Sequence, residues 1–184
     1  MKTFSAIAFF IATVVQVCGQ EFKQPYYIHV NGDSVALDHK RSFILTEAHP
    51  QRLEGRTVNG DKLWILADSI KHLMLDYTTY LSSKSETLYH YKPYVIPTKK
   101  GPCTHFMREL YRQGNAVILT SPFCSQCSYM RFYVYVDGKY VGRFTRQTIQ
   151  SLTATYFNDH KALVEYTKRK RFVIGKVYSI LTRK

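Results

Sequence analysis

The chain reads YYIHVNGDSVAL over residues 26–37, and this stretch indicates the fold class. Two short runs rich in β-branched and aromatic residues flank Asn31-Gly32, a pair that tight hairpin turns prefer because it tolerates positive φ. The tetrapeptide VNGD returns at residues 58–61, again between two extended runs, and Asp137-Gly138 supplies a third turn of this kind. The three hairpins predict an antiparallel meander.

The segments between these hairpins predict strands, a short helical turn and a loop. Further strands are expected at residues 74–81, 87–96 and 115–120, where strand-favouring residues gather. A single helical turn capped by Asp68 is expected over residues 67–73. A polar loop is expected over residues 97–102, which read PTKKGP.

A helix is expected over residues 104–111, because the apolar side chains there have helical spacing. Gly114 would end this helix. The apolar residues on its expected face are Phe106, Met107, Leu110 and Tyr111.

From Thr145 onward the apolar residues are spaced three and four apart, which predicts helices, and Thr145 is a suitable cap for the first one. Asn158-Asp159 would break this helix and start another, and residues 172–181 fit either a short helix or a strand. The prediction is one α+β domain over residues 20–184. Antiparallel hairpins or a meander, with a barrel-like arrangement as one option, would occupy 20–144, and the helical region would occupy 145–184.

Residues 1–19 have the features of a cleavable secretory signal peptide. Lys2 precedes an uncharged, mostly apolar run over residues 4–17, which is too short to span a bilayer, and Gly19 is a small residue at the expected cleavage point. We therefore expect export to the periplasm, the cell surface or the medium. Acylation of Cys18, as in a lipoprotein, is the alternative.

The chain is strongly basic: 26 Lys and Arg residues stand against 13 Asp and Glu, a net charge of +13. Removal of residues 1–19 takes away Lys2 and no acidic residue, which leaves +12. A basic run opens the C-terminal end with Lys168, Arg169, Lys170 and Arg171. In an exported protein this run predicts contact with anionic lipid, glycolipid or acidic polysaccharide rather than nucleic acid. A solvated basic tail that aids solubility is the alternative.

The cysteines leave three alternatives open. If a turn joins two strands around residues 121–129, the Cα atoms of Cys124 and Cys127 lie within about 7 Å of each other. That is close enough for a disulfide in an oxidising compartment. Cys103, His105, Cys124 and Cys127 could instead form a tetrahedral zinc site. Reduced or intermolecular thiols are the third alternative. No other cofactor is expected.

The order of these segments resembles a loose group of exported bacterial proteins of unknown function. The resemblance is carried by the early VNGD turn, the helix-Gly-strand unit expected over 106–120, the hairpin YVYVDGKYVGRF at 133–144 and the YFND motif at 156–159. The Cys124-Ser125-Gln126-Cys127 segment departs from the pattern. The resemblance implies export and a strand-rich fold with a helical end, and it carries no functional residues.

The sequence contains no recognisable catalytic motif. It lacks a Gly-x-Ser-x-Gly elbow, a phosphate-binding glycine-rich loop, a paired-histidine zinc helix and a calcium-binding loop. The hypothesis is a non-enzymatic binding or structural module with a basic C-terminal surface. A small secreted hydrolase built from scattered residues, or a zinc-stabilised binding domain, is the alternative.

Overall fold

The computed structural model describes residues 24–38, 40–45, 51–76, 88–121, 130–169 and 172–183. Several features of interest lie outside these residues and stay predictions. They are the signal peptide at 1–19 with Cys18, both cysteines of the expected disulfide, Cys124 and Cys127, and two members of the basic run, Lys170 and Arg171.

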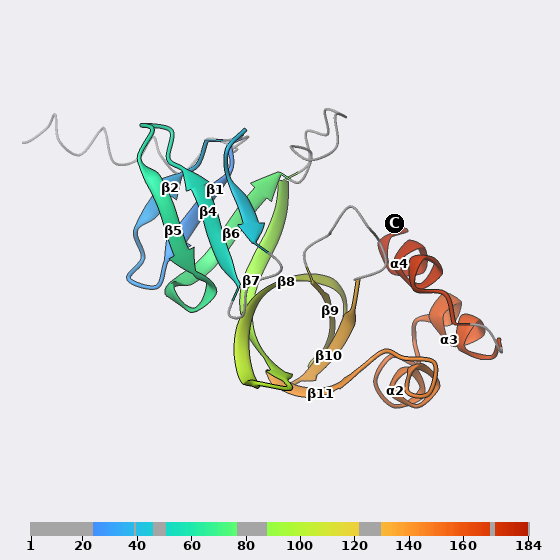
Figure 1. Cartoon of the computed structure of the whole chain (residues 1–184). Helices are drawn as coiled ribbons and strands as arrows, with labels where there is room; N and C mark the ends of the chain where they lie inside the picture. The colour runs from blue at the N-terminus through green and yellow to red at the C-terminus, as the bar shows by residue number, and fades with distance from the viewer. Residues whose placement is uncertain are drawn as a thin grey trace, which may run out of the picture.

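The protein is an antiparallel α+β structure (Figure 1). The strands are β1 (Tyr26–His29), β2 (Ser34–Ala36), β3 (Phe43–Leu45), β4 (Arg52–Arg56), β5 (Lys62–Leu66), β6 (Ile70–Asp76), β7 (Leu88–Thr98), β8 (Gly101–Gln113), β9 (Ala116–Thr120), β10 (Phe132–Val136) and β11 (Lys139–Arg143). The helices are the 3-10 helix η2 (Ala67–Ser69) and α2 (Ile149–Tyr156), α3 (Lys161–Thr167) and α4 (Ile174–Thr182). The expected fold class is confirmed.

The strands form two sheets. The larger sheet has eight strands in the order β11-β10-β9-β8-β7-β6-β1-β2, and the smaller sheet has the order β3-β4-β5. All strand pairs within these sheets are antiparallel. The barrel-like option is not realised as a closed barrel, because β11 and β2 remain the two ends of the larger sheet and do not pair with each other in the described part of the chain.

All three predicted hairpins are confirmed. β1 pairs with β2, β4 with β5, and β10 with β11. Gly32 and Gly60 in the two VNGD turns have φ values of 100° and 93°. In the third turn Asp137 and Gly138 have φ values of 49° and 75°, the backbone that a two-residue hairpin turn of this hand requires.

The first core lies between the smaller sheet and the part of the larger sheet formed by β7, β6, β1 and β2. Its fully buried members include Leu37, Leu53 and Leu73. The helical turn expected over residues 67–73 is shorter than predicted: only Ala67–Ser69 is helical, and Ile70–Leu73 opens β6.

The prediction of a helix over residues 104–111 is wrong, since these residues lie within the long strand β8. Phe106 packs into the first core, whereas its neighbour Met107 belongs to a different core on the opposite side of the sheet. A strand that is buried on both faces carries consecutive apolar residues, and such a run has no clean period of two. The apparent helical spacing therefore came from burial on both faces.

The polar loop expected over residues 97–102 is instead the tight end of the β7–β8 hairpin. Pro97 pairs with Pro102 and Thr98 pairs with Gly101, so only Lys99 and Lys100 form the turn. Gly101 has a φ of 110°, a conformation that favours glycine.

Beyond β7 the larger sheet curls, and Figure 1 shows strands β7 to β11 following a round path. The inside of this curl is a second core that includes Met107, Leu119 and Tyr135. The hydroxyl of Tyr135 on β10 donates a hydrogen bond of 2.6 Å to the carbonyl oxygen of Val95 on β7. One side chain thereby ties together two strands that are not neighbours in the sheet.

The three C-terminal helices cover the outer side of β8–β11. We call this layer the helix-covered core; its fully buried side chains include Ile118, Phe132, Phe157 and Leu163. The cap position of α2 is Thr148 rather than the predicted Thr145, whose hydroxyl accepts hydrogen bonds from the backbone N–H groups of residues 147 and 148 in the turn before the helix. Among the described residues, none of the helices combines the length and the apolar character needed to span a bilayer.

Candidate functional site

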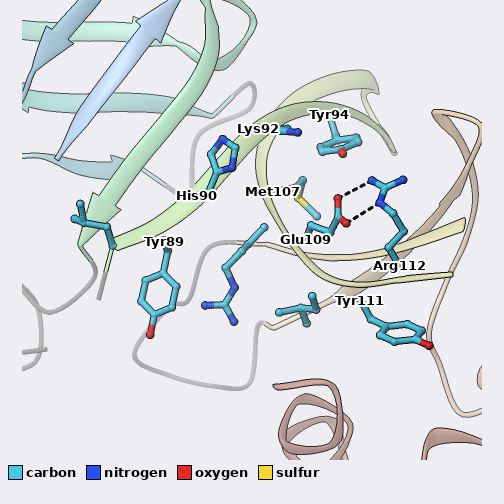
Figure 2. Close-up of a pocket in the computed structure, with 11 residues that line it drawn as sticks. Tyr89, His90, Lys92, Tyr94, Met107, Glu109, Tyr111 and Arg112 are labelled. Carbon is cyan, nitrogen blue, oxygen red and sulfur yellow. Dashed lines mark hydrogen bonds and ion pairs between the residues drawn. The ribbon is translucent and has the colours of Figure 1, made fainter. Parts of the chain in front are cut away.

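A cavity lies where β7 and β8 separate. The two strands pair over residues 92–98 and 101–107. Beyond this point residues 88–91 of β7 pair with β6, while residues 108–113 of β8 pair with β9. The resulting fork opens a cavity of about 510 Å³, which we call the fork pocket (Figure 2). Its lining residues are Leu88, Tyr89, His90, Lys92, Tyr94, Met107, Arg108, Glu109, Leu110, Tyr111 and Arg112.

A β-bulge brings the carboxylate of Glu109 and the guanidinium of Arg112 together in this pocket. In a regular strand, residues three apart point to opposite faces, but the register with β9 shifts between Glu109 and Tyr111. Glu109 and Arg112 therefore share a face. The Nε and one terminal nitrogen of Arg112 donate to the two carboxylate oxygens of Glu109, at 2.8 and 2.7 Å. Figure 2 shows the two side chains pointing toward each other.

One lining residue, His90, pairs with a second histidine, His72, which is not part of the pocket lining. The Nδ1 of His72 on β6 is 2.9 Å from the Nε2 of His90 on β7. Partial burial lowers the pKa of both rings, and the positive charge of Lys92 lowers both pKa values further. For His90, the carboxylate of Glu109 opposes this effect. Both rings are therefore predominantly neutral near pH 7.

Arg108 is held between two aromatic rings. Its guanidinium carbon lies 4.5 Å from the ring centre of Tyr89 and 5.5 Å from that of Tyr178. One of its terminal nitrogens also donates to the hydroxyl of Tyr178 at 2.8 Å. Since Tyr178 belongs to α4, these contacts attach the C-terminal helix to β8 and fix the guanidinium at the edge of the pocket.

Lys92 and Tyr94 contribute an ammonium group and a hydroxyl to the pocket lining. No ion pair of Lys92 is found among the described residues. Burial, together with the nearby carboxylate of Glu109, raises the pKa of Tyr94, which keeps its hydroxyl protonated as a hydrogen-bond donor. A ligand would therefore meet an ammonium group beside a neutral hydroxyl.

The charges that line the pocket favour a negatively charged ligand. Three of its lining side chains are cationic, Lys92, Arg108 and Arg112, and one is anionic, Glu109, so its formal charge is +2 with His90 neutral. Tyr89, Tyr94 and Tyr111 add flat walls with polar ends. This arrangement can hold a small anion that also has an apolar or ring-shaped surface.

Half of the predicted zinc set lies in the described chain. Cys103 and His105 are two residues apart on β8, so they project from the same face, and His105 is buried. The other two predicted ligands, Cys124 and Cys127, lie outside the described residues. Within the described ranges, no three His, Cys, Asp or Glu side chains gather closely enough to hold a metal ion. The zinc and disulfide alternatives both stay predictions.

The described part of the basic run, Lys168 and Arg169, follows α3 and is exposed. Lys168 forms an ion pair with Glu165 one turn earlier. Arg169 lines a separate hollow of about 170 Å³ together with Arg146, and no acidic residue is found among its described lining. The contact of this run with an anionic surface stays a prediction.

The fork pocket could not be identified from the sequence. Glu109 was predicted to lie in a helix, and nothing in the local sequence places His72 next to His90, 18 positions away. The only local signal was an unusual density of charge on β8, with Arg108, Glu109 and Arg112 close together in an otherwise strand-like region.

Comparison of the chain with models of protein families, with the sequences of curated proteins and with solved structures finds no match.

Proposed function

We propose that this protein is a non-enzymatic binding module that acts outside the cytoplasm, and that its fork pocket binds the acidic unit of a saccharide. The observation that carries the proposal is the +2 charge of a 510 Å³ cavity walled by tyrosines. A sugar ring offers apolar C–H groups to the tyrosines and hydroxyls to their polar ends. Its carboxylate or sulfate would pair with Lys92.

The chemistry of the pocket favours binding over hydrolysis. Glycoside hydrolysis usually requires two carboxyl groups on opposite sides of the scissile bond. The described lining contains one, Glu109, and Arg112 engages both of its oxygens. An acyl-transfer mechanism would need a nucleophile beside a base, and the described lining includes neither serine nor cysteine.

Action outside the cytoplasm is supported by the predicted signal peptide at residues 1–19 and by the resemblance to exported bacterial proteins. An acidic saccharide suits this location, because such sugars are abundant components of cell surfaces and their surroundings.

A polymeric ligand would find a second contact at the basic run. Arg146 and Arg169 face one hollow with no acid in its described lining, so an acidic chain could contact these arginines as well as the fork pocket.

The test is calorimetric titration of the mature protein with a glucuronic acid disaccharide and with its neutral glucose counterpart. We expect only the acidic sugar to bind, with an affinity that falls as salt is raised from about 0.05 to about 0.5 M. Lys92→Gln should weaken binding about tenfold or more, because a hydrogen bond to a charged group is worth roughly 1.5–3 kcal/mol. The matched control is Lys62→Gln on β5, an exposed lysine outside the pocket.

Equal binding of the two sugars, or equal loss in the two lysine variants, would contradict the proposal. For the basic run, the test is binding of alginate, a uronic acid polymer, by a variant in which Lys168, Arg169, Lys170 and Arg171 are all glutamine. We expect this variant to bind alginate more weakly than the parent. Loss of binding to anionic vesicles but not to alginate would assign the run to lipid instead.

A further inference from the structure

Three side chains with metal-binding atoms share one face of the β6–β7 pair. Met74 lies directly opposite His90 in the antiparallel register, and His72 is two residues from Met74 on the same strand. Because side chains alternate along a strand, all three project from the same face. The intervening residues Leu73 and Tyr91 are buried in the first core on the other face.

This face of the sheet is open to solvent. His72 and Met74 are half-buried and His90 is exposed. The strand on the other side of β6 places Ile28 opposite His72, which gives the group an apolar neighbour. A metal ion could therefore enter directly from water.

The separation of the two imidazole nitrogens fits a shared metal ion. Two metal–nitrogen bonds of about 2.0–2.1 Å that meet at about 90° place their nitrogens about 2.9 Å apart. The Nδ1 of His72 and the Nε2 of His90 are separated by 2.9 Å. The two rings thus already have the spacing of neighbouring ligands in a square-planar or tetragonal site.

We propose that His72, Met74 and His90 form a copper-binding site. Imidazole binds copper well, and the thioether of Met74 is a soft ligand that favours Cu⁺ over zinc, magnesium or calcium. For a nitrogen-rich site, Cu²⁺ also binds more tightly than the other common divalent first-row ions. Water would occupy the remaining positions. This site differs from the zinc set predicted around Cys103 in residues, strands and preferred metal.

The surrounding charges set the expected strength of the site. Lys71 and Lys92 act electrostatically on His72, and their positive charge opposes a bound cation. Glu109 acts on His90 with the opposite sign. We therefore expect a solvent-exposed site of moderate affinity. The proposal does not depend on saccharide binding: His90 also lines the fork pocket, but the copper ligands are imidazole and thioether groups and the test is different.

The test uses the full mature chain with its thiols blocked by N-ethylmaleimide. It is titrated with Cu²⁺ and, separately, with Cu⁺ kept reduced by ascorbate. Calorimetry and the visible and electron paramagnetic resonance spectra should report one Cu²⁺ per chain with nitrogen ligands. His72→Gln and His90→Gln should each weaken Cu²⁺ binding at least tenfold. Met74→Leu should weaken Cu⁺ binding at least tenfold and change Cu²⁺ binding less.

The matched control is His29→Gln, a histidine of the neighbouring strand β1, which should leave copper binding unchanged. Thermal unfolding of each variant confirms that the chain is folded. The proposal is overturned if the His72 and His90 variants bind Cu²⁺ as the parent does, or if His29→Gln loses as much. It is also overturned if Zn²⁺ competes on equal terms with Cu²⁺. In either case the two rings form only a hydrogen-bonded pair or an unselective site.

Discussion

Strand β8 contributes side chains to both the helix-covered core and the fork pocket, yet the core is apolar and the pocket is charged. In the helix-covered core, Phe132 and Phe157 are completely buried among apolar neighbours. In the fork pocket, the side chains of Arg112 and Glu109 remain 50% and 36% exposed. The bulge after Glu109 shifts the alternation of side chains by one residue, which places Arg112 on the same face as Glu109.

If the fork pocket binds a ligand as proposed, stability and recognition are carried by different regions of the molecule. Removing apolar atoms from the helix-covered core leaves a cavity, whereas removing a charge from the fork pocket exposes its partner to water. Substitutions in the first region should therefore change the free energy of unfolding, and substitutions in the second should change ligand binding.

The largest effect is expected for Phe157→Ala in the helix-covered core. Phe157 packs edge-on against Phe144 and Tyr111, at ring distances of 6.4 and 6.1 Å. Its truncation should lower the free energy of unfolding by about 3–5 kcal/mol, measured by urea denaturation. Val141→Ala, at a side chain that is 41% exposed, is the control and should change it little. A cost below about 1 kcal/mol for Phe157→Ala would mean that the helices contribute little to stability.

An intermediate effect is expected for Tyr135→Phe inside the curl. The variant loses the hydrogen bond to the carbonyl of Val95, which should cost about 1 kcal/mol near pH 7. Tyr156→Phe in α2, for which no hydroxyl hydrogen bond is found within the described chain, is the control. Equal stability of the two variants would show that this hydrogen bond does not help to hold the curl together.

The same tyrosine predicts a dependence on pH. Burial raises the pKa of Tyr135 well above its ordinary value of 10.0, and the neighbouring Tyr140, Tyr133 and Tyr94 raise it further. Above about pH 10 the unfolded chain loses this phenolic proton while the folded chain keeps it, so stability falls as pH rises. Denaturation curves between pH 8 and pH 11 should show a smaller fall for Tyr135→Phe than for the parent. A parallel fall in both would assign the loss to other groups.

The smallest effect on stability is expected for Arg112→Gln in the fork pocket. Its ion pair with Glu109 is largely exposed, and such pairs contribute about 0–1 kcal/mol. The variant leaves the Glu109 carboxylate uncompensated, however, so it should weaken binding of the acidic disaccharide. Arg41→Gln, which removes the exposed pair with Asp38, is the control for charge loss elsewhere. Severe destabilisation by Arg112→Gln would contradict the separation of the two regions.

Local chemistry made part of the fold predictable. The turns at Asn31-Gly32 and Asp137-Gly138 were identified because glycine adopts positive φ without strain, as Gly32 and Gly138 do. The first two C-terminal helices were identified because apolar residues recur there at a period of 3.6, whereas residues 172–181, which form α4, fitted a helix or a strand. In both cases neighbouring residues suffice to decide the structure.

The error at residues 104–111 shows where local reasoning fails. Phe106 and Met107 are buried on opposite faces of β8, in two different cores, so their hydrophobicity reports burial and not period. Whether a strand has one covered face or two depends on elements distant in the sequence. The smaller sheet covers one face of β8, and the curl encloses the other.

By itself the sequence determined the hairpins, the helical C-terminal region and the excess of positive charge, because each depends on residue type and short-range spacing. Only the tertiary structure decided the fork pocket and the His72, Met74 and His90 group. The pocket exists because β7 and β8 exchange pairing partners at Tyr91 and Arg108. The histidines meet because strands β6 and β7 pair in one register, and a shift of one residue would move them to opposite faces.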